Sequence, residues 1–189
     1  YTGPGGEVAI PDTIDGLPVT SIGEGAFSSC SNLISVTISD GVTGIGRWAF
    51  INCAGLTSVT IGSSVTNIGN YAFIHCASLS SVVFPESITS ISADMFSGCT
   101  GLRSVFIPGS VTNIMRAAFS TCTNLTSVYC SGNAPATYPY AFWGASKATV
   151  YYLPGTTGWG KTFGGRPTVL WLPEVVTGDA SFGVRTNQF

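Results

Sequence analysis

Hydrophobic residues recur along the chain at a fixed interval of 23 residues. Phenylalanine marks this interval at six positions: Phe27, Phe50, Phe73, Phe96, Phe119 and Phe142. Cys follows three residues after each Phe, with Ala145 in the last copy, and Leu, Val and Ile positions come next. The consensus unit reads A-F-x-x-C-x-x-L-x-S-V-x-I-x-x-x-V-T-x-I-G. A constant spacing of so many positions predicts a repeat architecture.

Each unit contains the signals of one turn of a solenoid. The segment LTSVTI, residues 56–61, ends in alternating apolar and β-branched positions, which predicts a short strand. PGS, residues 108–110, predicts a turn, and V-T-x-I predicts a return along another side. We expect the x-x-A-F segment to form a helical turn. Stacked units bury a continuous apolar column, with coils about 4.8 Å apart where strands pair.

The predicted fold is therefore a repeat solenoid of about six coils, with short parallel strands, turns and end caps. We expect residues 1–22 to form an N-terminal cap and a first partial coil. Residues 23–153 are the repeats, and residues 154–173 are an aromatic and Gly-rich C-terminal cap. Residues 174–189 leave the repeat period and are interpreted as a linker or the start of a following segment.

The stretch GTTGWGKT, residues 155–162, matches the phosphate-binding pattern G-x-x-x-x-G-K-[ST]. That loop requires a helix beginning at its Lys, so that the helix N-terminus faces the phosphate. Gly164, Gly165 and Pro167 fall within the first two turns of such a helix, and these residue types oppose it. We instead expect Trp159, Phe163 and Trp171 to cover the open apolar end of the last coil.

The repeat unit resembles leucine-rich repeats, and most closely the BspA-like bacterial type. The resemblance rests on the consensus above, with Pro85 and Pro108 after the strand, and covers residues 8–154. Residues 10–23 resemble a first coil typical of that family. The resemblance implies a curved, right-handed solenoid on secreted or surface-anchored proteins, which binds other molecules and catalyses nothing.

Composition agrees with an extracellular location. Only 8% of residues are charged, against roughly 25% in ordinary soluble domains, and Ser, Thr, Gly and Asn fill the polar positions. The net charge is −2 and the seven Lys and Arg residues are scattered singly, which argues against nucleic acid as a partner. The sequence has no apolar run long enough to span a membrane. Any signal or anchor is expected outside this chain.

The cysteines are predicted to be structural. Five share one repeat position and form an internal ladder: Cys30, Cys53, Cys76, Cys99 and Cys122. Buried free Cys behaves as a small hydrophobe, although one or two disulfides or a metal site remain alternatives. His75 occupies a variable polar position beside Cys76, and carboxylates do not pair in phase. We therefore predict no catalytic, cofactor or metal site, and no enzyme.

Two outward-facing groups are candidates for a ligand face. The first follows the strand position between the Val and Ile columns and becomes apolar and aromatic towards the C-terminus. It comprises Val83, Phe106, Tyr129 and Tyr152, with Arg103 nearby. The second is Trp48 with Tyr71, just before Ala-Phe on neighbouring coils. The alternative for both is packing that only stabilises the fold.

Three functions are consistent with these features. We favour a secreted or cell-surface binding and adhesion module whose partner is an extracellular protein or glycan. The first alternative is a passive spacer that presents another domain. The second is binding to ice or another crystal surface through a ladder of threonines at one repeat position. This ladder has no second row of threonines beside it, and it comprises Thr20, Thr43, Thr66, Thr89 and Thr112.

Overall fold

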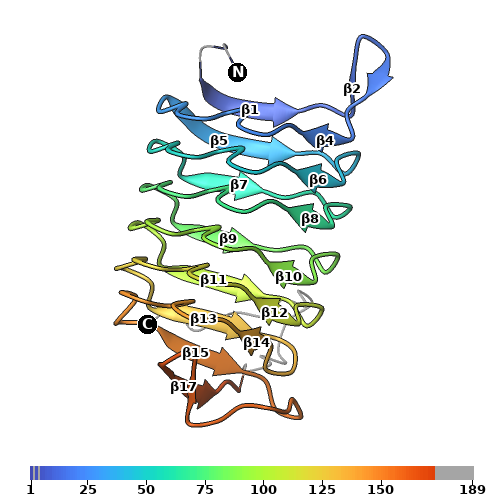
Figure 1. Ribbon diagram of the computed structural model, residues 1–189. Helices are drawn as coiled ribbons and strands as arrows, with labels where there is room; N and C mark the ends of the chain where they lie inside the picture. Colours follow the sequence, from blue (N-terminus) through green and yellow to red (C-terminus); the bar gives the residue numbers. More distant parts are fainter. Residues whose placement is uncertain (2, 4, 173–189) are drawn as a thin grey trace, which may run out of the picture.

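The computed structural model describes residues 1, 3 and 5–172 as a β-solenoid (Figure 1). One strand of each coil contributes to a first row, which we call the strand face. It contains β1 (Gly6–Ile10), β5 (Leu33–Ile38), β7 (Ser58–Thr60), β9 (Ser81–Val83), β11 (Ser104–Ile107), β13 (Ser127–Cys130), β15 (Thr149–Tyr152) and β17 (Arg166–Leu170). A shorter strand contributes to a second row: β4 (Ser21–Ile22), β6 (Gly44–Ile45), β8 (Asn67–Ile68), β10 (Ser90–Ile91), β12 (Asn113–Ile114) and β14 (Ala136–Thr137). Pairing along both rows is parallel, which confirms the predicted solenoid.

The predicted helical turns are absent from the described residues. The segment before and after each Phe is a run of β-turns, in which Ile51 N–H donates to the carbonyl of Trp48 at 3.0 Å. Trp48 and Asn52 have positive φ angles of 57° and 59°, which an α-helix does not contain. The N–H of Phe50 consequently donates to Ala72 of the next coil, at 2.8 Å, rather than within its own coil. These turns therefore link coils as the strands do.

Stacked phenylalanine rings form the centre of the core. Consecutive rings from Phe27 to Phe142 lie 5.0 to 5.6 Å apart, with interplanar angles between 1° and 11°. All six are buried. Each ring covers the next because every coil places the same side chain at the same height, which is what the 23-residue interval requires.

The cysteine ladder lies beside this stack, and all six cysteines are free thiols. Each buried thiol of the ladder donates a hydrogen bond to a Phe carbonyl of the preceding coil, as Cys53 Sγ does to Phe27 at 3.0 Å and Cys122 Sγ to Phe96 at 3.1 Å. Burial raises the pKa of the Cys53 thiol to about 11 and that of Cys122 to about 12. The four buried thiols of the ladder are thus neutral and hydrogen-bonded.

Hairpins flank the array at both ends. β2 (Thr13–Ile14) pairs antiparallel with β3 (Leu17–Pro18), and this hairpin projects from the first coil (Figure 1). β16 (Thr162–Phe163) pairs antiparallel with the start of β17 through a Gly164-Gly165 turn, where the phosphate-loop pattern would need a helix. Because a hairpin stands where the helix would begin, no helix N-terminus faces a phosphate here, and the segment is not a phosphate loop.

The aromatic residues expected at the C-terminal end separate into two groups. The ring of Trp159 stacks on Tyr152 at 5.2 Å and lies 5.0 Å from Phe163, which in turn contacts Phe142. The ring of Trp171 lies instead 4.9 Å from Tyr129, on the strand face. Residues 173–189, including the predicted following segment, lie outside the described residues.

Candidate functional site

The strand face presents two outward columns, because side chains alternate across each strand. One is a serine column made of Ser35, Ser58, Ser81, Ser104 and Ser127. Ser35 pairs with Ser58, and Ser81, Ser104 and Ser127 are in register with one another. The other begins with Thr37 and Thr60 and becomes apolar from β9 onward. We call its apolar part the apolar stripe, which comprises Val83, Phe106, Tyr129, Tyr151 and Val169. It takes one residue from each successive strand.

The prediction that Tyr152 belongs to this column is wrong. Tyr151 pairs with Tyr129, and Tyr152 pairs with Cys130 in the inward-facing column. The cause is a last coil that is one residue shorter, because Val150 pairs with Val128 only 22 positions earlier. A shift of one residue moves a side chain to the opposite face of a sheet. Tyr152 therefore packs against Trp159 at the end of the array.

The stripe is open at both ends and half-buried in the middle. Val83 is 65% exposed and Val169 is 45% exposed, whereas Phe106, Tyr129 and Tyr151 are half-buried. The rings of Tyr129 and Tyr151 stack at 5.2 Å with an interplanar angle of 22°, and the ring of Trp171 lies 4.9 Å from that of Tyr129. One face of each tyrosine ring is thus occupied by the other, and Tyr129 also contacts Trp171. Their edges and hydroxyl groups remain for a partner.

Hydroxyl groups of the solenoid divide into two kinds. Three hydroxyls of the Thr ladder are engaged internally: Thr43 Oγ1 donates to the Thr20 carbonyl at 3.1 Å, Thr66 Oγ1 to that of Thr43 at 3.3 Å and Thr112 Oγ1 to that of Thr89 at 3.2 Å. Within the described residues, no protein group bonds the hydroxyls of Ser58, Ser81 or Ser104. These three hydroxyls of the serine column are therefore free to bond a partner. The Thr ladder, a single rank with three of its five donors engaged, offers a crystal surface little.

The second predicted patch is largely satisfied by its own neighbours. Trp48 and Tyr71 are half-buried, with ring centroids 6.1 Å apart. The guanidinium of Arg47 lies 3.8 Å from the centroid of Trp48 and 5.3 Å from that of Tyr71, which is a cation–π arrangement. The patch consequently has few free surfaces for a ligand.

The sequence reasoning missed an exposed aromatic cluster on the last coil. Tyr140 is 63% exposed and Trp143 is 60% exposed, and Tyr138 is exposed beside them in the chain. Tyr140 lies 23 positions beyond Ala117, at the repeat position that holds Trp48 and Tyr71 in earlier coils. Reading that position to the end of the array would have found it.

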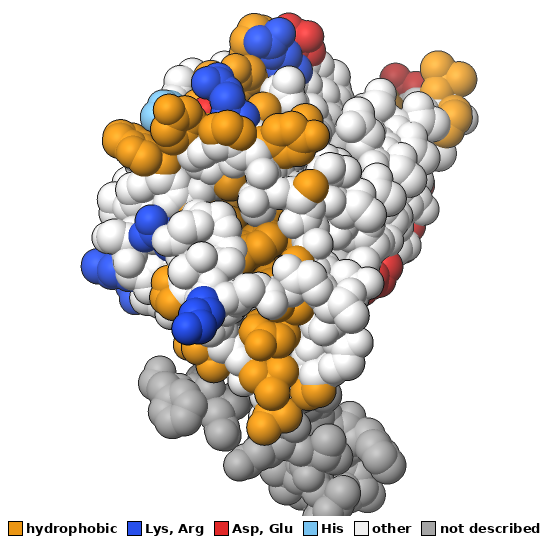
Figure 2. Space-filling view, turned by 60° about the horizontal axis from the view of Figure 1, so that its bottom comes forward, with side chains coloured by type: hydrophobic (Ala, Val, Ile, Leu, Met, Phe, Trp, Pro, Cys, Tyr) orange, Lys and Arg blue, Asp and Glu red, His pale blue; other side chains and the backbone are white. Residues whose placement is uncertain are grey.

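Charge is segregated along the solenoid, which the scattered positions in the sequence concealed. Residues 1–46 contain no Lys or Arg and five acidic residues: Glu7, Asp12, Asp15, Glu24 and Asp40. Residues 97–172 contain no acidic residue and five basic ones: Arg103, Arg116, Lys147, Lys161 and Arg166. With the C-terminal end turned towards the viewer, Figure 2 shows Lys and Arg side chains on this end and Asp and Glu mostly at its margins. It also shows hydrophobic side chains gathered in a band.

The predicted ligand-face residue Arg103 lies at the entry to β11. It is exposed, and its N–H bonds the Ser80 carbonyl at 2.9 Å, so that it stands beside the start of β9. It is the basic residue next to the N-terminal end of the apolar stripe.

The described residues hold no arrangement suited to catalysis by Cys and His. His75 is exposed, whereas Cys76 is buried, and burial holds the pKa of its thiol well above the usual range. A nucleophilic cysteine needs a thiolate. Among the same residues, no three His, Cys, Asp or Glu side chains gather as metal ligands do. Nor does any described helix have the length and apolarity to cross a membrane.

Comparison with known proteins supplies the family. A family model described as BspA type leucine rich repeat region, in 6 copies, matches residues 20–149. The structure is similar to that of a leucine rich repeat protein of T. pallidum, with 31% identity and a TM-score of 0.69, covering 82% of this chain and 77% of that one. No curated protein matches the sequence.

Two further structures extend the comparison. A leucine rich cell surface protein of Faecalibacterium prausnitzii is 33% identical, with a TM-score of 0.57, and the match covers 80% of this chain and 48% of that one. The chain thus spans about half the length of that protein. The pneumococcal vaccine antigen PcpA has a TM-score of 0.66 at 14% identity, over 88% of this chain and 41% of that one, which shows the fold alone.

Proposed function

Because the chain belongs to the BspA-type leucine-rich repeat family, we propose that it is a non-catalytic binding module of a bacterial cell surface. Its partner is an extracellular protein, which it contacts through the strand face. A repeat solenoid supplies an extended surface on which neighbouring coils present one residue each. A similar F. prausnitzii protein is described as a cell surface protein, which supports the same location for this chain.

The observation that carries the proposal is the apolar stripe beside the serine column. Five successive strands each direct one apolar residue outward, of which Val83 and Val169 are exposed and the others half-buried, and three serine hydroxyls have no protein partner among the described residues. Exposed apolar residues rimmed by hydrogen-bonding groups are typical of protein contact surfaces. At about 4.8 Å per strand, the stripe is roughly 19 Å long.

Ring geometry favours a protein over a glycan at this face. A sugar ring docks flat on an exposed aromatic face, but the faces of Tyr129 and Tyr151 stack on one another and Trp171 lies against Tyr129. Tyrosine edges and hydroxyls, by contrast, suit the mixed apolar and polar contacts of protein interfaces.

The cluster of Tyr140 and Trp143 is the second candidate site. Its side chains are the most exposed large aromatic groups among the described residues, and Trp and Tyr are the residue types that dominate binding energy at interfaces. It lies on the turn segments rather than on the strand face. Separate substitution of the two sites distinguishes them.

The test is a binding screen against extracellular proteins and a glycan array with three chains. These are the wild type, a stripe variant (Phe106→Ser/Tyr129→Ser/Tyr151→Ser) and a cluster variant (Tyr140→Ser/Trp143→Ser). Circular dichroism and thermal unfolding establish that all three fold. The proposal expects protein binding that the stripe variant loses and the cluster variant keeps. The reverse pattern assigns binding to the cluster. Equal behaviour of all three chains would refute both sites and favour the passive spacer.

A further inference from the structure

Both strand rows are interrupted between the same two coils. On the strand face, β1-β5-β7 and β9-β11-β13-β15-β17-β16 form separate sheets, and in the second row β4-β6-β8 is separate from β10-β12-β14. In the second row, side chains bridge the interruption: Ser87 Oγ donates to the Val65 carbonyl at 2.6 Å and Ser92 Oγ to that of Ile68 at 2.5 Å. On the strand face, only Ser80 bonds across, to the Thr57 carbonyl.

An unusually large core residue, Phe84, lies at the interruption. The inward column that holds Ile61 and Ile107 in the neighbouring coils holds the larger Phe84 here, buried edge-on against Phe96 with ring centroids 5.8 Å apart. An oversized side chain in a packed core displaces the backbone around it. Pro85 lacks an N–H, but Pro108 occupies the same position where the ladder is intact, so the proline is not sufficient.

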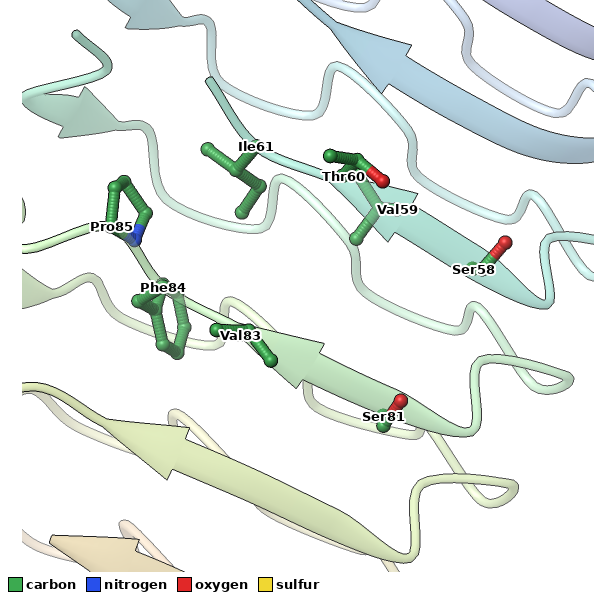
Figure 3. A pocket seen from close by; sticks show the side chains of 8 residues that line it. All are labelled: Ser58, Val59, Thr60, Ile61, Ser81, Val83, Phe84 and Pro85. Carbon is green, nitrogen blue, oxygen red and sulfur yellow. The ribbon is translucent and has the colours of Figure 1, made fainter. Parts of the chain in front are cut away.

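The interruption opens a groove of about 280 Å³ on the strand face (Figure 3). Its lining is partly apolar, from Val59, Ile61, Val83, Phe84 and Pro85. The rest of the lining consists of hydroxyl-bearing side chains: Ser58, Thr60 and Ser81. None of the lining residues is charged. Its volume falls just below the roughly 300–1,000 Å³ of typical small-molecule sites, which suits a single large side chain.

We propose that this groove is an anchor site for one aromatic side chain, Tyr or Trp, of the partner protein, and that acidic residues flank that side chain. The apolar lining takes the ring, while the unbonded hydroxyls of Ser58 and Ser81 meet its O–H or N–H. The groove adjoins Val83, the first residue of the apolar stripe, so one partner surface covers both. The inference rests on the proposed function and specifies its partner.

The acidic character proposed for the partner residues beside the aromatic side chain follows from the segregation of charge along the solenoid. All five charged residues between positions 97 and 172 are basic, and exposed Arg103 stands beside the entry to β9. Glu86 follows Pro85 at the exit end of the groove. The acidic groups of the partner therefore lie towards Arg103. Opposite charges at an interface set the orientation of the partner more than its affinity.

The test uses two blocked tripeptides as probes, acetyl-Asp-Tyr-Asp-amide and acetyl-Lys-Tyr-Lys-amide, titrated into the isotopically labelled chain. Amide chemical shifts report where each probe binds. We expect saturable shifts at residues 58–61 and 81–84, with an affinity of about 1 mM. The Asp-flanked probe is expected to bind roughly twofold to fivefold more tightly, and this advantage disappears in Arg103→Ala or at high salt.

Two variants and a matched control keep the test decisive. Thr60→Arg fills the rim of the groove without touching the core, and Thr37→Arg places the same side chain on the paired residue of β5, outside the groove. Phe84→Ile restores the residue type of the neighbouring coils and is expected to close the interruption, which slows amide exchange in β9. Probe binding should be lost in Thr60→Arg and Phe84→Ile and kept in Thr37→Arg. Binding that all three variants retain, or shifts confined to other residues, would overturn the site.

The outcome is separable from that of the binding screen. If the stripe variant loses the protein partner while Thr60→Arg keeps it, the proposed function stands and the anchor site falls. The groove could instead be occupied by the exposed Trp143 of a second copy of this chain. Sedimentation over a range of concentrations tests this alternative by measuring the oligomeric state. Dimers that Trp143→Ser abolishes would overturn assignment of the groove to a foreign protein.

Discussion

The column of buried thiols makes the folded state sensitive to alkaline pH. Burial raises the pKa of five thiols above the ordinary value of 9.0: Cys53 to about 11, Cys122 and Cys130 to about 12, and Cys76 and Cys99 well above it. The unfolded chain ionises these thiols near pH 9, whereas the folded chain keeps them protonated. Folded-state stability is therefore complete below about pH 8 and falls as the pH rises towards 11–12.

The loss of folded-state stability is large because the contributions of the five thiols add. Each contributes about 1.4 kcal/mol at one pH unit above its ordinary pKa, so five lower the free energy of unfolding by about 7 kcal/mol at pH 10. A domain of this kind is stable by about 5–15 kcal/mol in total. We therefore expect much of the stability to be lost near pH 10, where many proteins without buried thiols remain folded.

The assay is urea unfolding followed by circular dichroism, with a reductant present, at several pH values between 7.5 and 10. Cys122→Ala removes one titrating thiol, and Ala145 already occupies this position in the next coil. Between pH 7.5 and pH 10, the free energy of unfolding of this variant should fall by about 1.4 kcal/mol less than that of the wild type. Val128→Ala removes buried volume but no titrating group. Its free energy of unfolding should therefore depend on pH as that of the wild type does. A free energy of unfolding that stays constant to pH 10, or the same loss in Cys122→Ala as in the wild type, would refute the reasoning.

Three further predictions test the packing. Phe73→Ala breaks the ring stack at its centre and should lower the free energy of unfolding by about 3–5 kcal/mol in urea titrations. Asp40→Asn should lower the melting temperature at pH 7, because Ser63 N–H and Oγ both donate to Asp40 Oδ1 and lower the pKa of that carboxyl. This difference should vanish as the pH falls below the ordinary carboxyl pKa of 3.8, where the wild type loses the same contribution. Gly165→Ala, at a φ of 78° in open space, should destabilise by about 1 kcal/mol, and Gly164→Ala by more, because its Cβ would lie 2.7 Å from Phe142. Equal effects of the two glycine substitutions in thermal unfolding would contradict the structure.

The residues that face inward were predictable from the chain alone. Every coil offers the same buried environment to the same position, so the Phe, Cys, Leu, Val and Ile columns each repeat at one interval. That interval predicted the stacked rings from Phe27 to Phe142 and the parallel rows of strands. The local conformation of the Ala-Phe segment was less accessible, because positive φ angles at residues such as Trp48 replace helical geometry without changing the interval.

The candidate site was only partly predictable, because outward residues have no common environment to hold them in phase. Val83, Phe106 and Tyr129 lie on the predicted column, but the short last coil replaced Tyr152 with Tyr151. Segregation of charge is present in the sequence, but it becomes visible only when the charged residues are grouped by coil.

The sequence by itself thus determined the solenoid, since burial of one apolar face per 23 residues leaves the chain no other way to satisfy all its repeats. The tertiary structure decided how neighbouring coils meet. We expect the pairing of β7 with β9 to depend on the volume of Phe84 against Phe96, and whether a hydroxyl is free depends on its distance from a carbonyl one coil away. Such distances are set by packing between coils, which a repeat pattern does not encode.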